Sequence, residues 1–504
     1  MTSMKEDRHG EGPPGWGDLL RGRNLIRSVA LCGSVALHAI NLYLSTTILP
    51  SVVADIGGLD YYAWNTSVFV VASIIAAALS ARLLARLGAR GAFGFGAAIF
   101  VVGAALCALA PTMGVMLVGR TVQGFGGGFL VALPYPLIRH VFDERLWPRA
   151  MALISSMWGI ATLLGPAVGG VFAEFGVWRA AFWSLIPVTL VFTLLAIRVL
   201  PEGSGRAEEE GAGAPGVPLL QLVLLTAAVI AASVGSVTTG PIASLASVGL
   251  ALLLLAGLVG LERRPTGDRL LPRGAFDLAS PLSILYLISA LLAVTVTCTE
   301  IFVPLFLQVL HRRSPLEAGY LAALMSAGWT LAAVLWSGLE GTRLRRMLRA
   351  SPFVSLASLG TLAVLMPVPG GESWTELIPL SVALVVVGIG VGMAYPHIAA
   401  RVLVVAPSDE EEITASSIMT VQLCATALGA AAAGVIVNLA GLGGSTPSGD
   451  GGMVAAVADV ARASRALFVV LLIVPLFTLR LLWPRAPEYA REGEPDRDEW
   501  KRVD

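Results

Sequence analysis

The chain has 504 residues, of which 56% are hydrophobic and only 13% carry a charge. That charged share is about half of what a soluble domain carries, so the composition excludes an ordinary soluble protein and indicates one that resides in a lipid bilayer. Basic and acidic residues balance to a formal net charge of zero, which gives no indication of a nucleic-acid partner.

Polar N-terminal residues come first along the chain. The stretch 1–27 is charged and contains Gly and Pro, and it lacks the short apolar core of a signal peptide. We therefore expect a cytoplasmic tail over 1–28.

Apolar runs long enough to cross a bilayer then recur to the end of the chain. A spanning helix needs about 20 apolar residues, and only a helix satisfies its own backbone polar groups inside the hydrocarbon layer. By this criterion we predict fourteen membrane helices, at 29–53, 62–84, 92–110, 112–138, 149–173, 179–200, 219–236, 241–261, 281–309, 316–339, 351–368, 376–405, 412–440 and 461–483. The runs 219–236 and 241–261 are short and give the weakest signal.

Arginine marks one side of these helices. It is frequent in both tails and in every second connection, as at Arg82, Arg86 and Arg90 or at Arg343, Arg345, Arg346 and Arg349. The connections 55–67 and 367–376 contain none. Because basic loops stay in the cytoplasm, we predict an inner (cytoplasmic) membrane protein with both termini cytoplasmic. Arg312, Arg313, Arg462 and Arg465 depart from this pattern.

A Gly/Pro-rich stretch with three consecutive glutamates, 201–218, is typical of a solvated linker. The predicted organisation is therefore a tail 1–28, a six-helix bundle 29–200, the linker 201–218, two extra membrane helices 219–261, a second six-helix bundle 281–483 and a tail 484–504. Short Arg/Gly turns occupy equivalent places in the two halves. Duplicated halves are typical of secondary transporters, whose substrate site lies between them.

The most specific motif lies in the fifth predicted helix and comprises Gly159, Gly165, Pro166, Gly169 and Gly170. Glycines on one face allow a neighbouring helix to approach closely. A proline inside a helix removes a backbone donor and bends it. We expect a tight, kinked contact between helices, although generic packing of small residues gives a similar pattern.

This motif resembles the fifth-helix signature of the antiporter branch of the major facilitator superfamily. Further resemblances to that branch are Leu49-Pro50 with Asp55-Ile56-Gly57, Gly119–Gly128 with the intramembrane Arg120, Trp178–Phe182 with Pro187, Pro304–Gln308 and Ser314–Gly319. Together they cover about residues 29–485. The resemblance implies an all-α integral membrane fold of two six-helix bundles with two additional helices between them, as in the fourteen-span branch that contains drug:proton antiporters.

Two positions depart from the superfamily pattern. The turn after the second helix keeps Arg86, Gly88 and Arg90, but Ala85 replaces the usual Asp of a charge network that locks the cytoplasmic gate. In the first helix, Asn41 stands nine residues before the proline, where this branch often has an Asp. The usual gating network is therefore in doubt, and the first helix offers no obvious carboxylate in the middle of the membrane.

Ionisable groups within the apolar runs are functional candidates, because such groups are costly in hydrocarbon unless they are paired or hydrated. We predict proton coupling by Glu300, by Arg120, which could also bind an anionic group, and by His38. Each has a structural alternative: a water-filled mouth for Glu300, a structural pair for Arg120 and helix packing for His38. Asn41, Gln123, Tyr395 and His397 are predicted to line the substrate cavity.

The predicted function is secondary active transport, as proton-coupled efflux of small amphiphilic or drug-like compounds by alternating access. The alternatives are a dedicated exporter of one metabolite, such as a siderophore or an antibiotic, and a non-transporting membrane sensor or scaffold. The sequence has no GxxxxGK[ST] stretch for ATP binding and no catalytic constellation, so neither an ATP-driven pump nor an enzyme is expected. The four cysteines lie in apolar runs, so we expect no metal site and no cofactor. The expected partners are a small-molecule substrate, protons and the lipid bilayer, with the protein monomeric.

Overall fold

The structure, a computed structural model, describes residues 16–143, 146–201, 218–238, 241–264, 269–277, 280–336, 339, 341–370, 373–405, 410–442 and 449–489. Most of the predicted tail 1–28, the linker 201–218 and the end of the tail 484–504 lie outside these ranges. The elements are α1 (Trp16–Leu19), α2 (Gly22–Ile56), η1 (Leu59–Tyr61), α3 (Trp64–Ala108), α4 (Met113–Ala132), α5 (Pro134–Val141), α6 (Trp147–Glu174), α7 (Trp178–Val199), α8 (Leu219–Val237), α9 (Pro241–Glu262), α10 (Pro281–Leu310), α11 (Pro315–Trp336), α12 (Gly341–Leu365), α13 (Trp374–Val405), α14 (Glu411–Leu439), α15 (Gly449–Leu471) and α16 (Ile473–Tyr489).

Fourteen segments of the described chain are helical, long and apolar enough to cross a membrane. The expected all-α integral membrane fold is therefore confirmed. The two weakest predicted spans are both present, as α8 and α9.

Several helices begin or end away from the predicted positions. The second and third spans belong to the continuous element α3, which turns sharply at Gly88 (φ 66°, ψ 178°). Only glycine adopts this conformation without steric cost, so the chain turns within a single residue. The span predicted at 112–138 is divided before Pro134, which lacks the backbone donor needed to continue the helix.

Near the C-terminus, α12 begins at Gly341, well before the predicted start of its span. The added turns are rich in arginine, and an apolarity criterion detects only the part of a helix that lies in hydrocarbon. The last predicted span is divided between α15 and α16 at Leu472, because Pro475 has no backbone N–H to donate to the Leu471 carbonyl four residues earlier.

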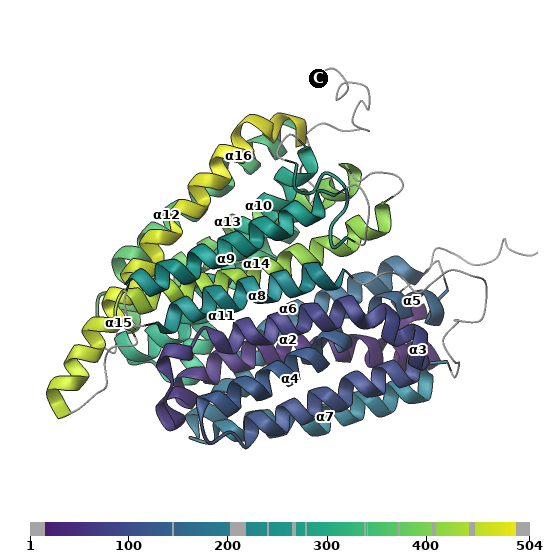
Figure 1. The fold of residues 1–504 in the computed structure, drawn as a ribbon, viewed down its shortest axis with the longest axis horizontal. Coiled ribbons are helices and arrows are strands. Elements are labelled where there is room, and N and C mark those ends of the chain that lie inside the picture. The colour runs from purple at the N-terminus through teal and green to yellow at the C-terminus, as the bar shows by residue number, and fades with distance from the viewer. Residues whose placement is uncertain are drawn as a thin grey trace, which may run out of the picture.

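The helices form two six-helix bundles, with α2–α7 in the first and α10–α16 in the second (Figure 1). The bundles meet at one end and diverge toward the other, where the C-terminal part of α16 lies (Figure 1). At the end where they meet, which we call the closed end, the rings of Tyr62 and Phe302 stack with centroids 5.2 Å apart. There, too, Gly170 of α6 lies against Leu316 of α11.

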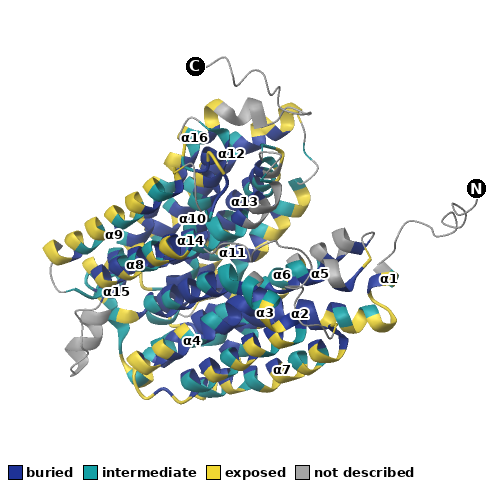
Figure 2. Cartoon of the chain, turned by 45° about the vertical axis from the view of Figure 1, so that its right-hand side comes forward, coloured by how far each residue is buried: buried dark blue, intermediate teal, exposed yellow. Residues whose placement is uncertain are grey.

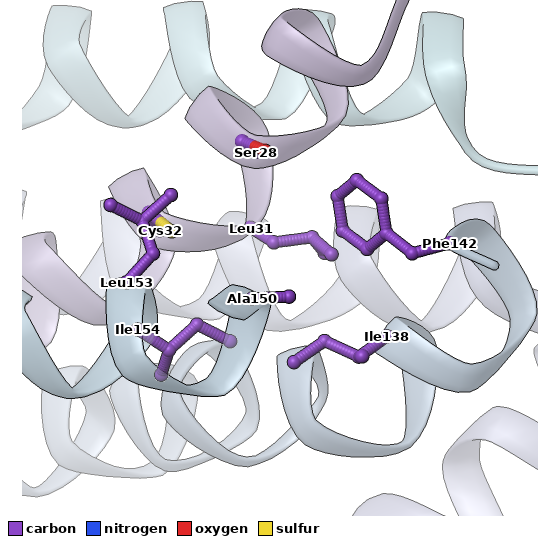
Figure 3. Close-up of a pocket in the computed structure, with 8 residues that line it drawn as sticks. All are labelled: Ser28, Leu31, Cys32, Ile138, Phe142, Ala150, Leu153 and Ile154. Atoms are coloured by element: carbon purple, nitrogen blue, oxygen red, sulfur yellow. The ribbon is translucent and has the colours of Figure 1, made fainter. Parts of the chain in front are cut away.

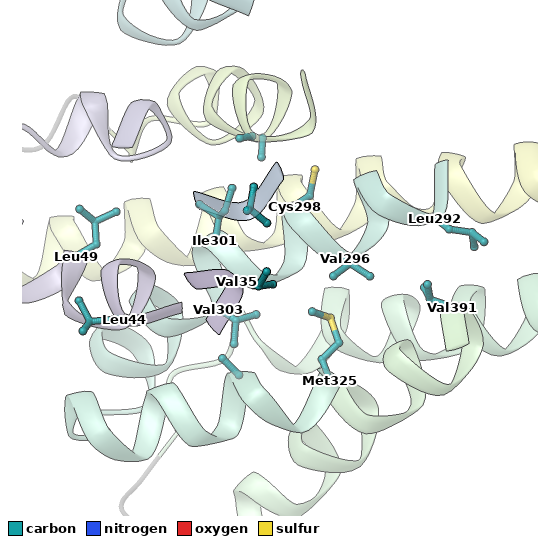
Figure 4. Packing of buried hydrophobic residues seen from close by; sticks show 14 of the residues in the cluster. Val35, Leu44, Leu49, Leu292, Val296, Cys298, Ile301, Val303, Met325 and Val391 are labelled. Carbon is teal, nitrogen blue, oxygen red and sulfur yellow. The ribbon is translucent and has the colours of Figure 1, made fainter. Parts of the chain in front are cut away.

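The spans differ strongly in burial. The span of α10 is 78% buried inside the protein, whereas that of α9 is 17% buried, and exposed residues follow the outer face of α9 (Figure 2). Residues of α10 such as Val296 and Ile301 belong to a hydrophobic cluster that also contains Val35 of α2 and Met325 of α11 (Figure 4). The most buried helix therefore lies where the two bundles join.

Helix α8 connects the two bundles through hydrogen bonds. The indole Nε1 of Trp64 on α3 donates to the carbonyl of Ser233 at 2.8 Å and to the hydroxyl of Ser236 at 3.2 Å. Asn438 on α14 donates from Nδ2 to the carbonyls of Ser236 and Asp60. The first of the two extra helices is thus part of the closed end and is not merely a peripheral addition.

Candidate functional site

A fully buried arginine lies at the centre of the first bundle. Arg120 on α4 is 0% exposed. Its Nη1 donates to Gln123 Oε1 at 2.7 Å, and its Nε donates to the backbone carbonyl of Asn65 at 3.3 Å. The guanidinium carbon lies 4.1 Å from the centre of the Phe69 ring, within the range of a cation–π contact.

Glycines bring α4 into backbone contact with α3 at this level. A Cβ atom built on Gly124 would lie 2.2 Å from the carbonyl oxygen of Phe69, and one built on Gly103 would lie 2.2 Å from the backbone nitrogen of Gln123. Neither position has room for a side chain. Gly124 of the fourth-helix motif and Gly103 of α3 therefore allow the guanidinium to reach backbone and ring atoms of α3.

One face of α2 completes the cluster. His38, Asn41 and Ser45 follow one another at spacings of three and four residues, which places them on the same side of a helix. The His38 ring lies 5.2 Å from that of Phe69, and the Ser45 hydroxyl accepts a hydrogen bond from Asn65 Nδ2 at 2.8 Å. Asn41 lies between these two contacts and is 0% exposed.

Many polar atoms in this group have no partner among the described residues. They are Arg120 Nη2, Gln123 Nε2, both side-chain amide atoms of Asn41, His38 Nδ1 and Asn65 Oδ1. We call Arg120, Gln123, Asn65, His38 and Asn41 the Arg120 cluster. No carboxylate forms a salt bridge with Arg120 within the described part of the chain.

The structure brings together four residues that the sequence singled out separately: Arg120, His38, Asn41 and Gln123. Asn65 and Phe69 were not predicted. The polar triplet that begins with Asn65, at the start of an apolar run, was the available signal for the first of them. Phe69 had none, because an aromatic residue in a membrane helix is unremarkable.

Glu300 lies in a different place, in the second bundle on α10, and is half-buried. The side chain of Tyr43 on α2 lies near enough to Glu300 for the two groups to interact electrostatically, and it also lies near Ser326 on α11. These three residues, which we call the Glu300 site, thus come from both bundles. Tyr43 follows Asn41 by two residues, about 200° around the helix, so α2 separates the Glu300 site from the Arg120 cluster. The structure does not pair Glu300 with Arg120 or His38.

The glycines of the fifth-helix motif lie on α6 against α2 and α11. A Cβ atom on Gly165 would lie 2.4 Å from Tyr43 Cβ, one on Gly169 would lie 2.9 Å from the Leu44 carbonyl, and one on Gly170 would lie 2.6 Å from Leu316 Cα. A Cβ atom on Gly159 would instead have no neighbouring atom within 4 Å.

The same junction includes two further motif residues. A Cβ atom on Gly319 of α11 would lie 3.0 Å from Cβ of Pro166. The fifth-helix motif thus contacts both its own bundle and the opposite one, next to the Glu300 site.

The remaining cavity candidates lie in the second bundle. The Tyr395 hydroxyl donates to Gln422 Oε1 at 2.9 Å, and its ring lies 5.2 Å from that of Trp329. His397 Nε2 is 3.0 Å from the backbone carbonyl of Trp336. These contacts hold both side chains in place, and their role in lining a cavity stays a prediction.

The turn after the second span is tied to its own bundle. Arg90 donates from Nε to the carbonyl of Leu200, just after the end of α7, at 2.8 Å. A cation is favourable there because the last carbonyls of a helix carry partial negative charge. Gly88 forms the turn itself, and Arg86 is exposed.

Two motif segments meet at the surface of the first bundle. Arg179 Nη1 is paired with Asp55 Oδ2 at 2.5 Å, and Trp178 Nε1 donates to the same oxygen at 3.2 Å. Asp55 belongs to the first-helix motif and the other two residues belong to the sixth-helix entry. The pair is half-exposed, so it fixes the ends of α2 and α7 relative to each other and contributes little energy.

The turn between α10 and α11 explains one departure from the arginine pattern. Arg313 is buried and donates from Nε to the His311 carbonyl at 3.1 Å, so it is part of a folded turn. His311 Nε2 is 3.2 Å from the carbonyl of Met366. Burial lowers the pKa of the His311 imidazole, and Arg313 lowers it further, whereas the Met366 carbonyl and Glu376 oppose the shift.

An apolar recess lies between α2, α5 and α6 (Figure 3). Its lining residues are Ser28, Leu31, Cys32, Ile138, Phe142, Ala150, Leu153 and Ile154. Apart from the Ser28 hydroxyl and a thiol, it lacks the converging polar groups that position a ligand. We do not assign it to the substrate.

Two helical bundles in a membrane, joined at one end and carrying buried polar groups within and between them, define a membrane transport protein. The chain belongs to the Major Facilitator Superfamily, whose family model matches residues 31–433. It is therefore a secondary active transporter of a small-molecule substrate, built as a multi-pass membrane protein.

Known proteins agree with this assignment. A protein of Mycobacterium tuberculosis named "Probable multidrug-efflux transporter" is 37% identical over 430 residues, which cover 84% of this chain and 90% of that protein. Multidrug resistance protein 3 of Bacillus subtilis is 22% identical over 370 residues, covering 72% and 69%.

Two solved structures share the fold. A bacterial homologue of the human lysosomal transporter Spinster, in an inward-facing and occupied conformation, has a TM-score of 0.58 at 17% identity and covers 94% of this chain and 100% of that one. A D-xylose–proton symporter has a TM-score of 0.62 at 12% identity, covering 93% and 99%.

Proposed function

We propose that this transporter exports small amphiphilic or drug-like compounds across the cytoplasmic membrane in exchange for protons. The observation that carries the proposal is the Glu300 site, where an ionisable carboxylate of one bundle lies within electrostatic range of a hydroxyl of the other. The names of the Mycobacterium tuberculosis and Bacillus subtilis relatives support a drug-like substrate.

Proton coupling follows from where the carboxylate lies. A charged carboxylate is stable where water reaches it, and its neutral form is tolerated where the bundles enclose it. Protonation of Glu300 therefore favours a conformation that closes around it, and deprotonation favours one that opens. Because Tyr43 lies on α2 and Ser326 on α11, a change in the charge of Glu300 would alter how these two helices pack.

The distribution of arginine supports an orientation with both termini in the cytoplasm and the closed end outside. In that orientation the structure is inward-facing, and export requires the closed end to open. The contacts that must then separate include Tyr62 with Phe302 and Gly170 with Leu316.

The other predicted residues take supporting roles in this proposal. His38 would relay protons, and Arg120 would set the electrostatic potential of the first bundle. Tyr395 and His397 would line the cavity, whereas Asn41 and Gln123 are buried inside the first bundle and do not reach the cavity in this conformation. Gly88 and Arg90 would hold the cytoplasmic gate turn together with Arg86, and the protein would act as a monomer.

Two measurements test the proposal. In everted vesicles with an established proton gradient, addition of a substrate should release protons from the vesicles, and vesicles without the transporter should show no release. In an efflux-deficient host, expression should raise resistance to several unrelated amphiphiles. Resistance to a single compound would instead indicate a dedicated exporter, and the absence of both effects would contradict transport by proton exchange.

A further inference from the structure

The guanidinium of Arg120 carries a charge without a counter-charge. Within the described part of the chain it contacts the Gln123 amide oxygen, the Asn65 carbonyl and the face of Phe69, all of which are neutral. Two titratable groups interact electrostatically with the guanidinium, the His38 imidazole and the Cys107 thiol. Neither is a carboxylate.

An arginine cannot escape this situation by losing its proton, because its pKa remains above the physiological range in proteins. A buried ion without a partner is costly, whether in a protein interior or in a membrane. The side chain is 0% exposed, so bulk water does not offset that cost in the conformation described. The cluster is therefore electrostatically incomplete.

Hydrogen-bonding groups next to this charge are also unused. Arg120 Nη2 and Gln123 Nε2 are buried donors without a partner, and the Asn41 amide has both of its atoms unpaired. Asn41 lies on the face of α2 between His38, whose ring contacts Phe69, and Ser45, which is bonded to Asn65. A guanidinium flanked by amide donors is a suitable arrangement for a small anion.

We propose that the Arg120 cluster is a binding site for a monovalent anion, held by Arg120 Nη2, Gln123 Nε2 and the amide of Asn41. The anion is either a carboxylate group of the transported compound or a small inorganic anion such as chloride. The first source rests on the proposed function and narrows its substrates to acidic amphiphiles, whereas the second does not depend on it.

Binding to the purified full-length protein tests the site without requiring transport. The protein is exchanged into isethionate, a bulky sulfonate that carries no carboxylate, at constant ionic strength, and its thermal unfolding is followed as chloride, benzoate or neutral benzamide is added. A ligand that binds only the folded state raises the unfolding temperature in a concentration-dependent way. Stabilisation by chloride identifies an inorganic anion, and stabilisation by benzoate but not by benzamide identifies a carboxylate.

Three variants locate the effect. Arg120→Gln should weaken anion stabilisation by at least about tenfold in midpoint concentration, because it removes a charged hydrogen-bond donor. Asn41→Asp should abolish it while leaving the protein folded, because the new carboxylate pairs with the guanidinium from within. Glu300→Gln should leave it unchanged, so failure of proton coupling and failure of the anion site remain separable.

The proposal is overturned if neither chloride nor benzoate stabilises the wild-type protein relative to isethionate. It is also overturned if the response in Asn41→Asp equals that of the wild type. Should Arg120→Gln fail to fold, the Asn41→Asp variant decides alone.

Discussion

Replacing Gly165 by alanine should disturb the packing of α6 against α2, whereas the same replacement at Gly159 should not. Both residues lie on α6 and belong to the same motif. The Cβ atom at position 165 would lie 2.4 Å from Tyr43 Cβ and 3.1 Å from the Leu44 nitrogen. Position 159 has nothing within 4 Å.

The expected energies follow from these distances. Carbon atoms pack best at about 3.5–4.0 Å, so the helices must separate by about 1 Å at position 165, and overpacking of this kind costs about 1–3 kcal/mol. Alanine gains up to about 1 kcal/mol of helix propensity over glycine at either site. The Gly159→Ala variant should thus be neutral or slightly stabilised. The free energy of unfolding of Gly165→Ala should be lower than that of Gly159→Ala by about 1–3 kcal/mol.

Thermal unfolding of the two purified variants in the same detergent measures the difference. Gly165→Ala should also reduce transport more than its loss of folded protein explains, because α6 supports Tyr43 beside Glu300. Equal unfolding temperatures for the two variants would refute the packing argument, since it depends entirely on what each added methyl group meets.

Two other predictions concern the closed end and the turn after α10. Trp64→Phe should lower stability by about 0.5–1.5 kcal/mol, because the Ser233 carbonyl loses its indole donor; the exposed Trp183→Phe is the control in the same unfolding assay, and equal effects would contradict a bridging role for α8. The pKa of His311 is lower in the folded protein than in the unfolded chain. As the pH falls, the unfolded chain therefore binds a proton at a higher pH than the folded protein does. The free energy of unfolding should consequently decrease as the pH drops below about 6.5. His311→Gln should flatten this dependence between pH 8 and pH 5, and an unchanged slope would show that other groups cause it.

Length and apolarity were sufficient to predict the number of spans, because every helix that crosses a bilayer needs an apolar stretch of a minimum length. They could not locate the kink at Gly88 or the early start of α12. A single backbone dihedral decides the first, and the second lies in a charged stretch outside the hydrocarbon.

The grouping of the candidate residues was beyond sequence reasoning. Helical periodicity places His38 and Asn41 on one face of α2, but it does not say that Arg120 of α4 lies opposite that face while Glu300 lies on another side. Tyr43 was missed because a tyrosine in an apolar run is usually read as packing. Its importance comes from Ser326 and Glu300, which are distant in sequence.

The role of Glu300 as proton carrier is tested most directly by comparing two transport modes in proteoliposomes. One is uptake or release driven by an imposed pH gradient, and the other is counterflow exchange of labelled substrate at equal pH. Glu317, which caps α11 through hydrogen bonds with Ser314, supplies the control variant Glu317→Gln, because glutamine preserves such a cap.

We predict that Glu300→Gln abolishes gradient-driven transport and retains counterflow, while Glu317→Gln retains both. Gradient-driven transport at the wild-type rate in Glu300→Gln would contradict the proposed coupling.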